Sequence, residues 1–349
     1  MPRAFIRCCS VAFVLGSLLV SFSSSATAQP EQPPAPLPPP GRLVDIGGWR
    51  LHLYCTGEAK PLQPTVILEA GLGDFSLEWS LVQPKVATFV RVCSYDRAGT
   101  GWSELGPNPR PMHQIVHELH VLLEKAGVRP PFVLVGHSYG GWLVRFYASK
   151  YPAEVAGMVL IEGGFDNPWR MVNGKLVRSE ELVTSKAIPA VRTSGPLTES
   201  DIPADAFQQM KAGAAWLVNG ANNPPRNKLP PDAQRMRTWV LARWQHLAAS
   251  VNPVEAEELA MLRAERAEGR HPLGGKPLVV ITRGIPDEGG PGGNVIELER
   301  RKKEHAELAK SLSRNGRQVI AEQSGHHVQI EQPEVVVTSV RDVITATRE

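Results

Sequence analysis

Residues 136–140, with the sequence Gly-His-Ser-Tyr-Gly, have the types and spacing that nucleophilic catalysis by a serine requires. They follow the apolar run 132–135 and precede a predicted helix over 142–151. A sharp turn from strand to helix needs small residues beside its centre, because the strained backbone brings the flanking residues close together. Such a turn would expose the hydroxyl of Ser138 near backbone N–H groups that can stabilise an oxyanion.

A serine hydroxyl is a poor nucleophile unless a base removes its proton during the attack. Among the ten histidines, His326 and His327 stand out because they follow a predicted strand over 318–321 and precede a terminal helix over 333–346. The carboxyl ends of parallel strands meet at one edge of a sheet, so we expect this loop at the same edge as Ser138. The order of serine first and histidine last is that of one known type of serine triad.

The elements that would position these residues alternate between strands and helices. Short apolar or alternating runs predict strands over 50–55, 65–69, 90–95, 132–135, 157–161, 277–282 and 318–321. Helical patterns cover 112–126, 142–151, 295–312 and 333–346. The alternation predicts an α/β fold, a mostly parallel sheet with helices on both faces.

The alternation stops between residues 166 and 273. This segment contains clusters of Asn, Pro and Gly and helical stretches such as 232–250, but no convincing strand. An insertion of this length between two strands is expected to lie over the strand ends as a helical lid. It would divide the core into residues 42–165 and residues 274–349.

Four segments carry further sequence motifs. Residues 69–73 read Glu-Ala-Gly-Leu-Gly, residues 96–103 read Asp-Arg-Ala-Gly-Thr-Gly-Trp-Ser, residues 136–141 extend the serine motif by a glycine, and residues 325–333 run from Gly-His to a proline. In that order, they resemble the oxyanion loop, the loop after the fourth strand, the nucleophile turn and the terminal histidine motif of the α/β-hydrolase-fold serine hydrolases. This family is esterase- and lipase-like and bears a lid. The chain departs from its common pattern at Ala70, where a histidine often precedes the glycine.

The resemblance implies a role for each residue of the site. Ser138 would be the nucleophile and His326 the base, whereas His327 would be a neighbour. The backbone N–H groups of Leu72 and Tyr139 would form the oxyanion hole. Because these donors belong to the backbone, the departure from the family pattern beside Leu72 does not remove them.

The resemblance leaves the acid of the triad open. It puts the acid after the strand over 277–282, where Asp287 follows Gly284 with the family's spacing. Some family members take the acid from the end of the preceding strand instead, where this chain has Glu162 and Asp166. The acid holds the imidazole in one tautomer and stabilises the imidazolium. Spacing favours Asp287, with Glu162 and Asp166 as the alternatives.

The same constellation implies hydrolysis of a carboxylic ester of a small or medium-sized substrate through an acyl-enzyme, without a metal or an organic cofactor. The serine argues against the family's dehalogenase and epoxide-opening relatives, which have an aspartate as nucleophile. Two alternatives remain open. One is amide cleavage, as in the prolyl aminopeptidases, with Glu180, Glu181, Glu199 or Asp201 as groups that could bind an amine. The other is a catalytically silent binding protein on the same fold.

The first residues have the pattern of an export signal. Arg3 and Arg7 precede a short apolar stretch, and residues 26–28 read Ala-Thr-Ala, a cleavage sequence. The apolar stretch is shorter than the roughly 20 residues that span a membrane. We therefore expect residues 1–28 to be removed and residues 29–41 to form a proline-rich linker. The mature protein would be periplasmic or secreted and would have no membrane span; an uncleaved anchor is the alternative.

Cys55 and Cys93 are the two cysteines outside the export signal. In the fold of the family the second strand lies beside the fourth, so the resemblance makes these residues cross-strand neighbours. A disulfide is then expected in an oxidising compartment, and two separate buried thiols are the alternative. The net charge of +3 is close to neutral and gives no support to nucleic-acid binding. The expected partner is a small ester or amide, and the sequence indicates no particular oligomeric state.

Overall fold

The computed structural model describes residues 38–165, 169–172, 175–178, 193–250, 256–267, 271–286 and 295–348. The predicted export signal and most of the linker lie outside these residues, and so do two of the candidate acids, Asp166 and Asp287.

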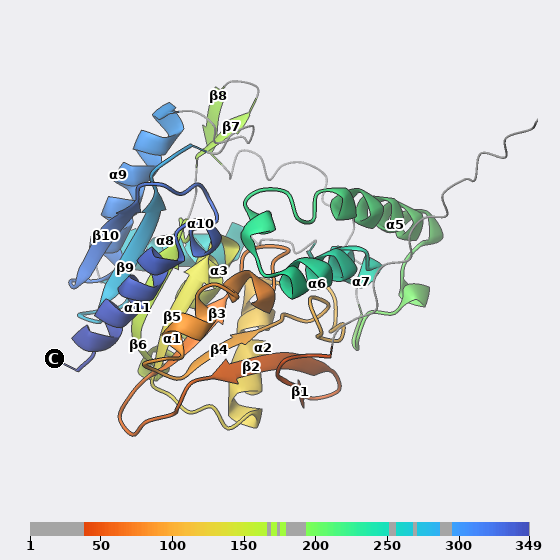
Figure 1. Ribbon diagram of the computed structural model, residues 1–349, viewed down its shortest axis with the longest axis horizontal. Helices are drawn as coiled ribbons and strands as arrows, with labels where there is room; N and C mark the ends of the chain where they lie inside the picture. The colour runs from red at the N-terminus through yellow and green to blue at the C-terminus, as the bar shows by residue number, and fades with distance from the viewer. Residues whose placement is uncertain are drawn as a thin grey trace, which may run out of the picture. The chain divides into compact units, whose positions relative to one another are not determined.

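A single eight-stranded sheet forms the centre of the fold (Figure 1). Its strands are β1 (Arg42–Asp45), β2 (Arg50–Thr56), β3 (Thr65–Glu69), β4 (Val92–Tyr95), β5 (Phe132–His137), β6 (Val155–Ile161), β9 (Leu278–Arg283) and β10 (Gly316–Ala321). Their order is β1-β2-β4-β3-β5-β6-β9-β10. β2 is antiparallel to both of its neighbours, and the other pairs are parallel. The mostly parallel sheet predicted from the alternation is confirmed. The short first strand was not predicted.

Alternate residues of the central strands face opposite sides of the sheet, as the pleat of a strand requires. Leu134 packs into one hydrophobic cluster, whereas its neighbours Val133 and Val135 pack into another. The first cluster is covered by α2 (Met112–Lys125), α3 (Tyr139–Lys150) and α9 (Val295–Leu312), and the second by α1 (Gln83–Val86) and α11 (Pro333–Ala346). Helices therefore cover both faces, as predicted.

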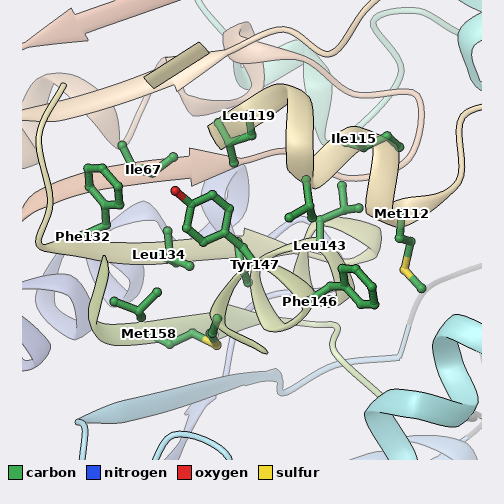
Figure 2. Packing of buried hydrophobic residues seen from close by; sticks show 14 of the residues in the cluster. Ile67, Met112, Ile115, Leu119, Phe132, Leu134, Leu143, Phe146, Tyr147 and Met158 are labelled. Carbon is green, nitrogen blue, oxygen red and sulfur yellow. The ribbon is translucent and has the colours of Figure 1, made fainter. Parts of the chain in front are cut away.

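Figure 2 shows how the first cluster anchors the strands that lead to the candidate site. Ile67 of β3, Leu134 of β5 and Met158 of β6 are fully buried with Leu119 of α2 and Leu143 of α3. Burying each such side chain contributes roughly 1.5–3 kcal/mol. The carboxyl ends of these three strands are consequently held in fixed positions relative to one another.

An insertion separates β6 from β9. The structure describes in it the strands β7 (Trp169–Val172) and β8 (Lys175–Arg178) and the helices α5 (Ala204–Asn219), α6 (Pro231–Leu241), α7 (Trp244–Ser250) and α8 (Ala256–Ala267). α5 packs against both α6 and α7 (Figure 1). The helical stretch expected over 232–250 is two helices. None of the helices among the described residues is long and apolar enough to cross a bilayer.

The expectation that the insertion contains no strand is wrong. β7 and β8 form an antiparallel pair, in which Trp169 lies opposite Arg178 and Val172 opposite Lys175. Each run has four residues, which is too short for periodicity to separate a strand from a loop. The residues between them, 173–174, read Asn-Gly, the most favoured sequence for a two-residue hairpin connection, and this signal could have predicted the pair.

The insertion contacts two short segments that follow strands of the main sheet. These segments are η1 (Ser76–Trp79) and α10 (Val328–Glu331). Leu229 and Ala233 of the insertion pack with Ile330 of α10 and with Leu77 of η1. Because η1 follows the oxyanion-loop motif and α10 lies within the histidine motif, this contact puts the insertion next to both.

Candidate active site

Ser138 connects β5 to α3 with φ 51° and ψ −115°. This backbone region is unfavourable for a residue with a Cβ atom, by an amount of order 1–3 kcal/mol. Two hydrogen bonds hold it: the N–H of Ser138 donates to the carbonyl of Ile161 (2.9 Å), and the N–H of Gly141 donates to the carbonyl of Ser138 (3.0 Å). α3 begins immediately after the serine, earlier than the helical pattern predicts. The turn has the strained form that the motif implies.

Glycines let the strand ends meet at this turn. A Cβ atom on Gly140 would lie 2.4 Å from the carbonyl oxygen of Glu69, so the turn touches the end of β3. A Cβ atom on Gly163 would lie 2.1 Å from the carbonyl oxygen of Ser138, so the turn also touches the residues after β6. Side chains at either glycine would force these segments apart.

Leu72 and Tyr139 each offer a backbone N–H next to the serine turn. Tyr139 is the first residue of α3, where an N–H has no partner within the helix. Leu72 lies in the loop after β3, and its side chain is 50% exposed. Among the residues that the structure describes, neither N–H donates a hydrogen bond. Both are therefore free to bind an oxyanion.

His326 lies beside the same turn, with its ring packed against that of His137 at a centroid distance of 4.8 Å. Its Nδ1 is 3.3 Å from Oε2 of Glu162, the residue directly after β6. Glu162 is buried and has a φ of 50°, so the two residues that follow β5 and β6 both adopt left-handed backbone conformations. The N–H of Arg283 donates to Oε1 of Glu162 (2.9 Å), which fixes the second carboxylate oxygen.

Cations keep Glu162 ionised. Arg301 Nη1 lies 3.5 Å and Arg283 Nε 3.7 Å from its Oε2. Burial alone would raise the pKa of Glu162, but the charge of Arg301 and the hydrogen bond with His326 outweigh it and hold that pKa below its ordinary value. Glu297 balances the two guanidinium groups, 2.8 Å from Arg283 and 2.6 Å from Arg301. The carboxylate facing His326 is therefore a permanent anion at neutral pH.

The structure brings together four of the residues that the sequence singled out: Leu72, Ser138, Tyr139 and His326. It adds Glu162, one of the alternatives for the acid, by direct contact with the histidine. Asp287, the acid that spacing favours, lies outside the described residues, as does Asp166. Glu162 could be singled out from the sequence only by its place directly after a strand.

His137 was not singled out by the sequence, although it precedes the serine. Its Nε2 donates to the backbone carbonyl of His326 (2.9 Å), and its Nδ1 lies 3.4 Å from the side-chain amide of Gln329. Burial, and then the nearby His326, lower the pKa of His137 to about 4. It is therefore neutral at physiological pH and ties the histidine loop to the serine turn. The only sequence signal was its position inside the serine motif.

The loop 96–103 is held by the carboxylate of Asp96. This carboxylate accepts hydrogen bonds from the N–H of Ser76 (2.8 Å) and of Trp102 (3.0 Å) and contacts His52 Nδ1 at 2.8 Å. A Cβ atom on Gly101 would lie 2.1 Å from the carboxylate, which explains the glycine in the motif. The motif thus builds a rigid support under the loop after β3.

Asp74, His137 and His327 are the one group among the described residues whose donor atoms, all within 4.8 Å of one another, are close enough to consider for a metal ion. Asp74 already pairs with two guanidinium groups, Arg226 at 3.0 Å and Arg237 at 3.4 Å. Two fixed cations beside the only carboxylate oppose the binding of a third. The group fits an internal ion-pair cluster better than a metal site.

A cavity of about 670 Å³ reaches the loop after β3. Its lining combines residues of the loop after β3 with polar and apolar side chains of the insertion. The lining residues are Leu72, Gly73, Asp74, Leu217, Asn219, Gly220, Asn223, Arg226, Arg237, Leu241, His246 and Leu247. Burial, and then Arg237, lower the pKa of His246 to about 4, so this histidine is neutral. Helices α5, α6 and α7 supply much of the wall, and Leu72 connects the cavity to the candidate oxyanion hole.

Comparison with known proteins agrees with this fold. The family model of the alpha/beta hydrolase family matches residues 66–339. An AB hydrolase superfamily protein of Gibberella zeae is 25% identical over 82% of this chain and 88% of its own length. Among solved structures, a thermophilic esterase from Thermogutta terrifontis (18% identity, TM-score 0.54) covers 86% of this chain and 95% of its own. The epoxide hydrolase CorEH (15% identity, TM-score 0.57) covers 87% and 98%.

The family match spans most of the chain, and the protein belongs to the α/β-hydrolase family. Membership of this family supports a hydrolase. The solved structures are too distant in sequence to say more than that the fold is shared.

Proposed function

We propose that this protein is a serine hydrolase that cleaves carboxylic esters of small or medium-sized substrates through an acyl-enzyme. The observation that carries the proposal is the strained turn at Ser138, flanked by two unused N–H groups and by a histidine whose Nδ1 meets a buried carboxylate. A site of this kind has a nucleophile, a base, an orienting acid and an oxyanion hole. The aspartate nucleophile of epoxide-opening relatives has no counterpart at position 138.

In the proposed reaction, Ser138 Oγ attacks the acyl carbonyl while Nε2 of His326 takes its proton. The contact of Nδ1 with Glu162 supports these roles for the two ring nitrogens of His326. A proton on Nδ1 is held by the carboxylate, so Nε2 is left as the acceptor. The N–H groups of Leu72 and Tyr139 stabilise the oxyanion. The imidazolium then protonates the leaving alcohol, and water, activated by the same histidine, releases the acid and regenerates Ser138.

For the acid, the 3.3 Å contact and the cation-stabilised charge support Glu162. Asp287, which the family spacing favours, is the competing assignment. The two assignments predict different outcomes for charge-neutralising variants at each position.

Ester cleavage is the proposed reaction rather than amide cleavage. An aminopeptidase needs acidic groups that can bind the amine of the substrate. Of the four candidates, Glu180 and Glu181 lie outside the described residues, and Glu199 and Asp201 lie within them. Asp201 accepts hydrogen bonds from the backbone N–H of Thr198 (2.8 Å) and from its hydroxyl (2.6 Å), and thereby caps a helical turn. This use of Asp201 gives the amide alternative no support.

We further propose that the protein is exported, that residues 1–28 are removed, and that Cys55 and Cys93 form a disulfide. The two cysteines are register partners of β2 and β4 with Cα atoms 4.0 Å apart, and their sulfurs are bonded in the structure. The neighbouring strands of the family fold thus bring them together, which supports the pairing. Intact mass of the purified protein, before and after reduction, tests both the cleavage site and the bond.

Fluorophosphonate labelling of the purified mature protein tests the proposed function. One phosphonyl adduct, mapped to Ser138 and absent from Ser138→Ala, is the expected result. Hydrolysis of p-nitrophenyl esters, with amino-acid p-nitroanilides unreactive, would then support the ester assignment. No adduct and no turnover in a folded sample would reject the proposal in favour of a silent binding protein.

A further inference from the structure

Arg97 is a buried arginine that has no part in the proposed reaction as described above. It follows Asp96 in the loop after β4, and only 5% of its side chain is exposed. Its Nη1 lies 2.5 Å from Oε1 of Glu69, the last residue of β3. The hydroxyl of Tyr95 donates to the other carboxylate oxygen of Glu69. Burial raises the pKa of Glu69, so these two donors are what makes an ionised carboxylate tolerable there.

The remaining N–H groups of Arg97 hold the loop after β3. Nη1 also donates to the carbonyl of Ala70 (2.8 Å), and Nη2 donates to the carbonyls of Gly71 and of Asp74 (3.3 Å). One planar guanidinium thus binds three backbone carbonyls and one carboxylate, a fixed geometry that lysine cannot reproduce.

The bond to Gly71 determines where the next N–H points. The carbonyl of Gly71 and the N–H of Leu72 belong to one planar trans peptide, so they point in opposite directions. A guanidinium that holds the carbonyl on one side therefore aims the N–H to the other side. It also draws electron density toward the carbonyl oxygen, which makes the N–H a stronger donor. The backbone N–H of Asp74 donates to the same carbonyl (3.2 Å) and supports the same orientation.

We infer that Arg97, held by Glu69, is a positioning residue for the oxyanion hole, acting by orienting and polarising the Gly71–Leu72 peptide. The guanidinium also lies 5.7 Å from the ring centroid of Tyr139, the residue that carries the second donor. The inference rests on the proposed function, because it assigns Arg97 to the oxyanion hole of that reaction. Arg97 itself touches neither the substrate nor the reacting atoms.

Arg97→Lys tests the inference, with Arg110→Lys as its matched control. Arg110 is equally buried and makes two hydrogen bonds to Glu118 (2.8 and 2.5 Å), but none to the loop after β3. Both variants keep the positive charge and lose guanidinium hydrogen bonds to a buried glutamate. We expect Arg97→Lys to lower kcat for p-nitrophenyl butyrate about 10- to 100-fold with little change in KM, because mispositioning a donor removes part of what losing it would remove. Arg110→Lys should keep kcat within about threefold, the scatter expected when no catalytic contact changes.

A second readout separates positioning from general loss of stability. A trifluoromethyl ketone adds the serine oxygen to its carbonyl and forms an oxyanion in the hole. Its affinity should weaken in Arg97→Lys by the same factor as kcat/KM and should stay unchanged in Arg110→Lys. Equal kcat and equal ketone affinity in the two variants would overturn the inference. If Arg97→Lys does not fold, Glu69→Gln takes its place, and an unchanged kcat in that variant would overturn the inference equally.

The outcomes also separate this inference from the proposed function. A wild-type protein that takes no phosphonyl adduct and turns over no ester would reject the proposed function itself. A wild-type protein that does both, while Arg97→Lys behaves as its control, would reject only the role of Arg97.

Discussion

Glu69 and Glu162 occupy equivalent positions on the two sides of the serine turn. Each is a buried glutamate at the carboxyl end of a parallel strand, β3 for Glu69 and β6 for Glu162. Glu69 binds Arg97, whose other N–H groups hold backbone carbonyls. Glu162 lies between Arg301 and Arg283 and faces the Nδ1 of His326.

The comparison shows that the neighbours, and not the residue type or the place in the sheet, decide what a buried glutamate does. Glu69 acts on the backbone, because its partner Arg97 lies between it and the loop after β3. Glu162 contacts a side chain, because its Oε2, which lies near both cations, also meets Nδ1 of His326. In the proposed reaction, the side of Glu69 would orient the N–H groups of the oxyanion hole, and the side of Glu162 would stabilise a positive imidazolium.

The largest expected effect comes from neutralising Glu162. Glu162→Gln should lower kcat about 10⁴-fold, because an amide can neither hold the required tautomer nor stabilise the imidazolium. Steady-state kinetics with p-nitrophenyl butyrate measures it. Glu118→Gln is the control, since Glu118 is equally buried beside an arginine but lies outside the site. If Asp287→Asn causes this loss of kcat and Glu162→Gln does not, the acid that acts with His326 is Asp287 and not Glu162.

Reduction of the proposed Cys55–Cys93 bond should lower the stability of the whole fold. Cys93 belongs to β4, the strand that leads to Arg97, and the bond to Cys55 closes 38 residues of chain. The chain-entropy model gives a loss of about 4 kcal/mol in unfolding free energy when this bond is removed. Urea unfolding with and without a phosphine reductant measures the loss. Identical unfolding curves, or two free thiols in the untreated protein, would contradict the proposed bond.

Glu78 is a buried residue of η1 that pairs with Arg226 (3.4 Å) and Arg237, and it should make the stability of the fold depend on pH. Burial, and then the nearby Asp74, raise the pKa of Glu78 to about 7, whereas that of Glu162 is lowered. Between pH 4.5 and 7 the folded state therefore binds a proton that the unfolded state has released, and stability falls as pH rises. The full shift corresponds to about 3 kcal/mol, and coupling to Asp74 and the two arginines reduces this amount.

Glu78→Gln should remove this contribution. Buried His137, His246 and His305 have lowered pKa values, so they act in the opposite direction below pH 6.5. The informative quantity is thus the difference between wild type and variant in urea midpoint, measured from pH 4.5 to 7.5. A difference that does not change with pH would show that Glu78 titrates normally.

The smallest effect is expected for Glu69→Gln. The amide keeps a hydrogen bond to Arg97 but loses its charge, so the guanidinium is held less firmly. We expect kcat to fall about tenfold, or 1.4 kcal/mol in activation free energy, with KM unchanged. A loss as large as that of Glu162→Gln would erase the distinction between the two glutamates.

Local sequence patterns predicted much of the fold. Alternation within β5 and β6 determines which side chains face each layer, because the side-chain period of a strand is two residues. The serine turn was equally visible, because its glycines are required wherever segments approach so closely. The short β7–β8 pair escaped because four residues carry too little periodicity. The catalytic roles of Ser138, His326 and either acid stay predictions for the labelling and kinetic experiments.

By itself, the sequence determined the α/β fold, the family and the elements that carry Ser138 and His326, because these depend on local periodicity and on short motifs. Only the tertiary structure decided that Glu162 faces His326, that His137 ties the histidine loop to the serine turn, and that Arg97 holds the loop of Leu72. These contacts join residues far apart in the chain. No local pattern encodes them, because they exist only where the ends of different strands come together at one edge of the sheet.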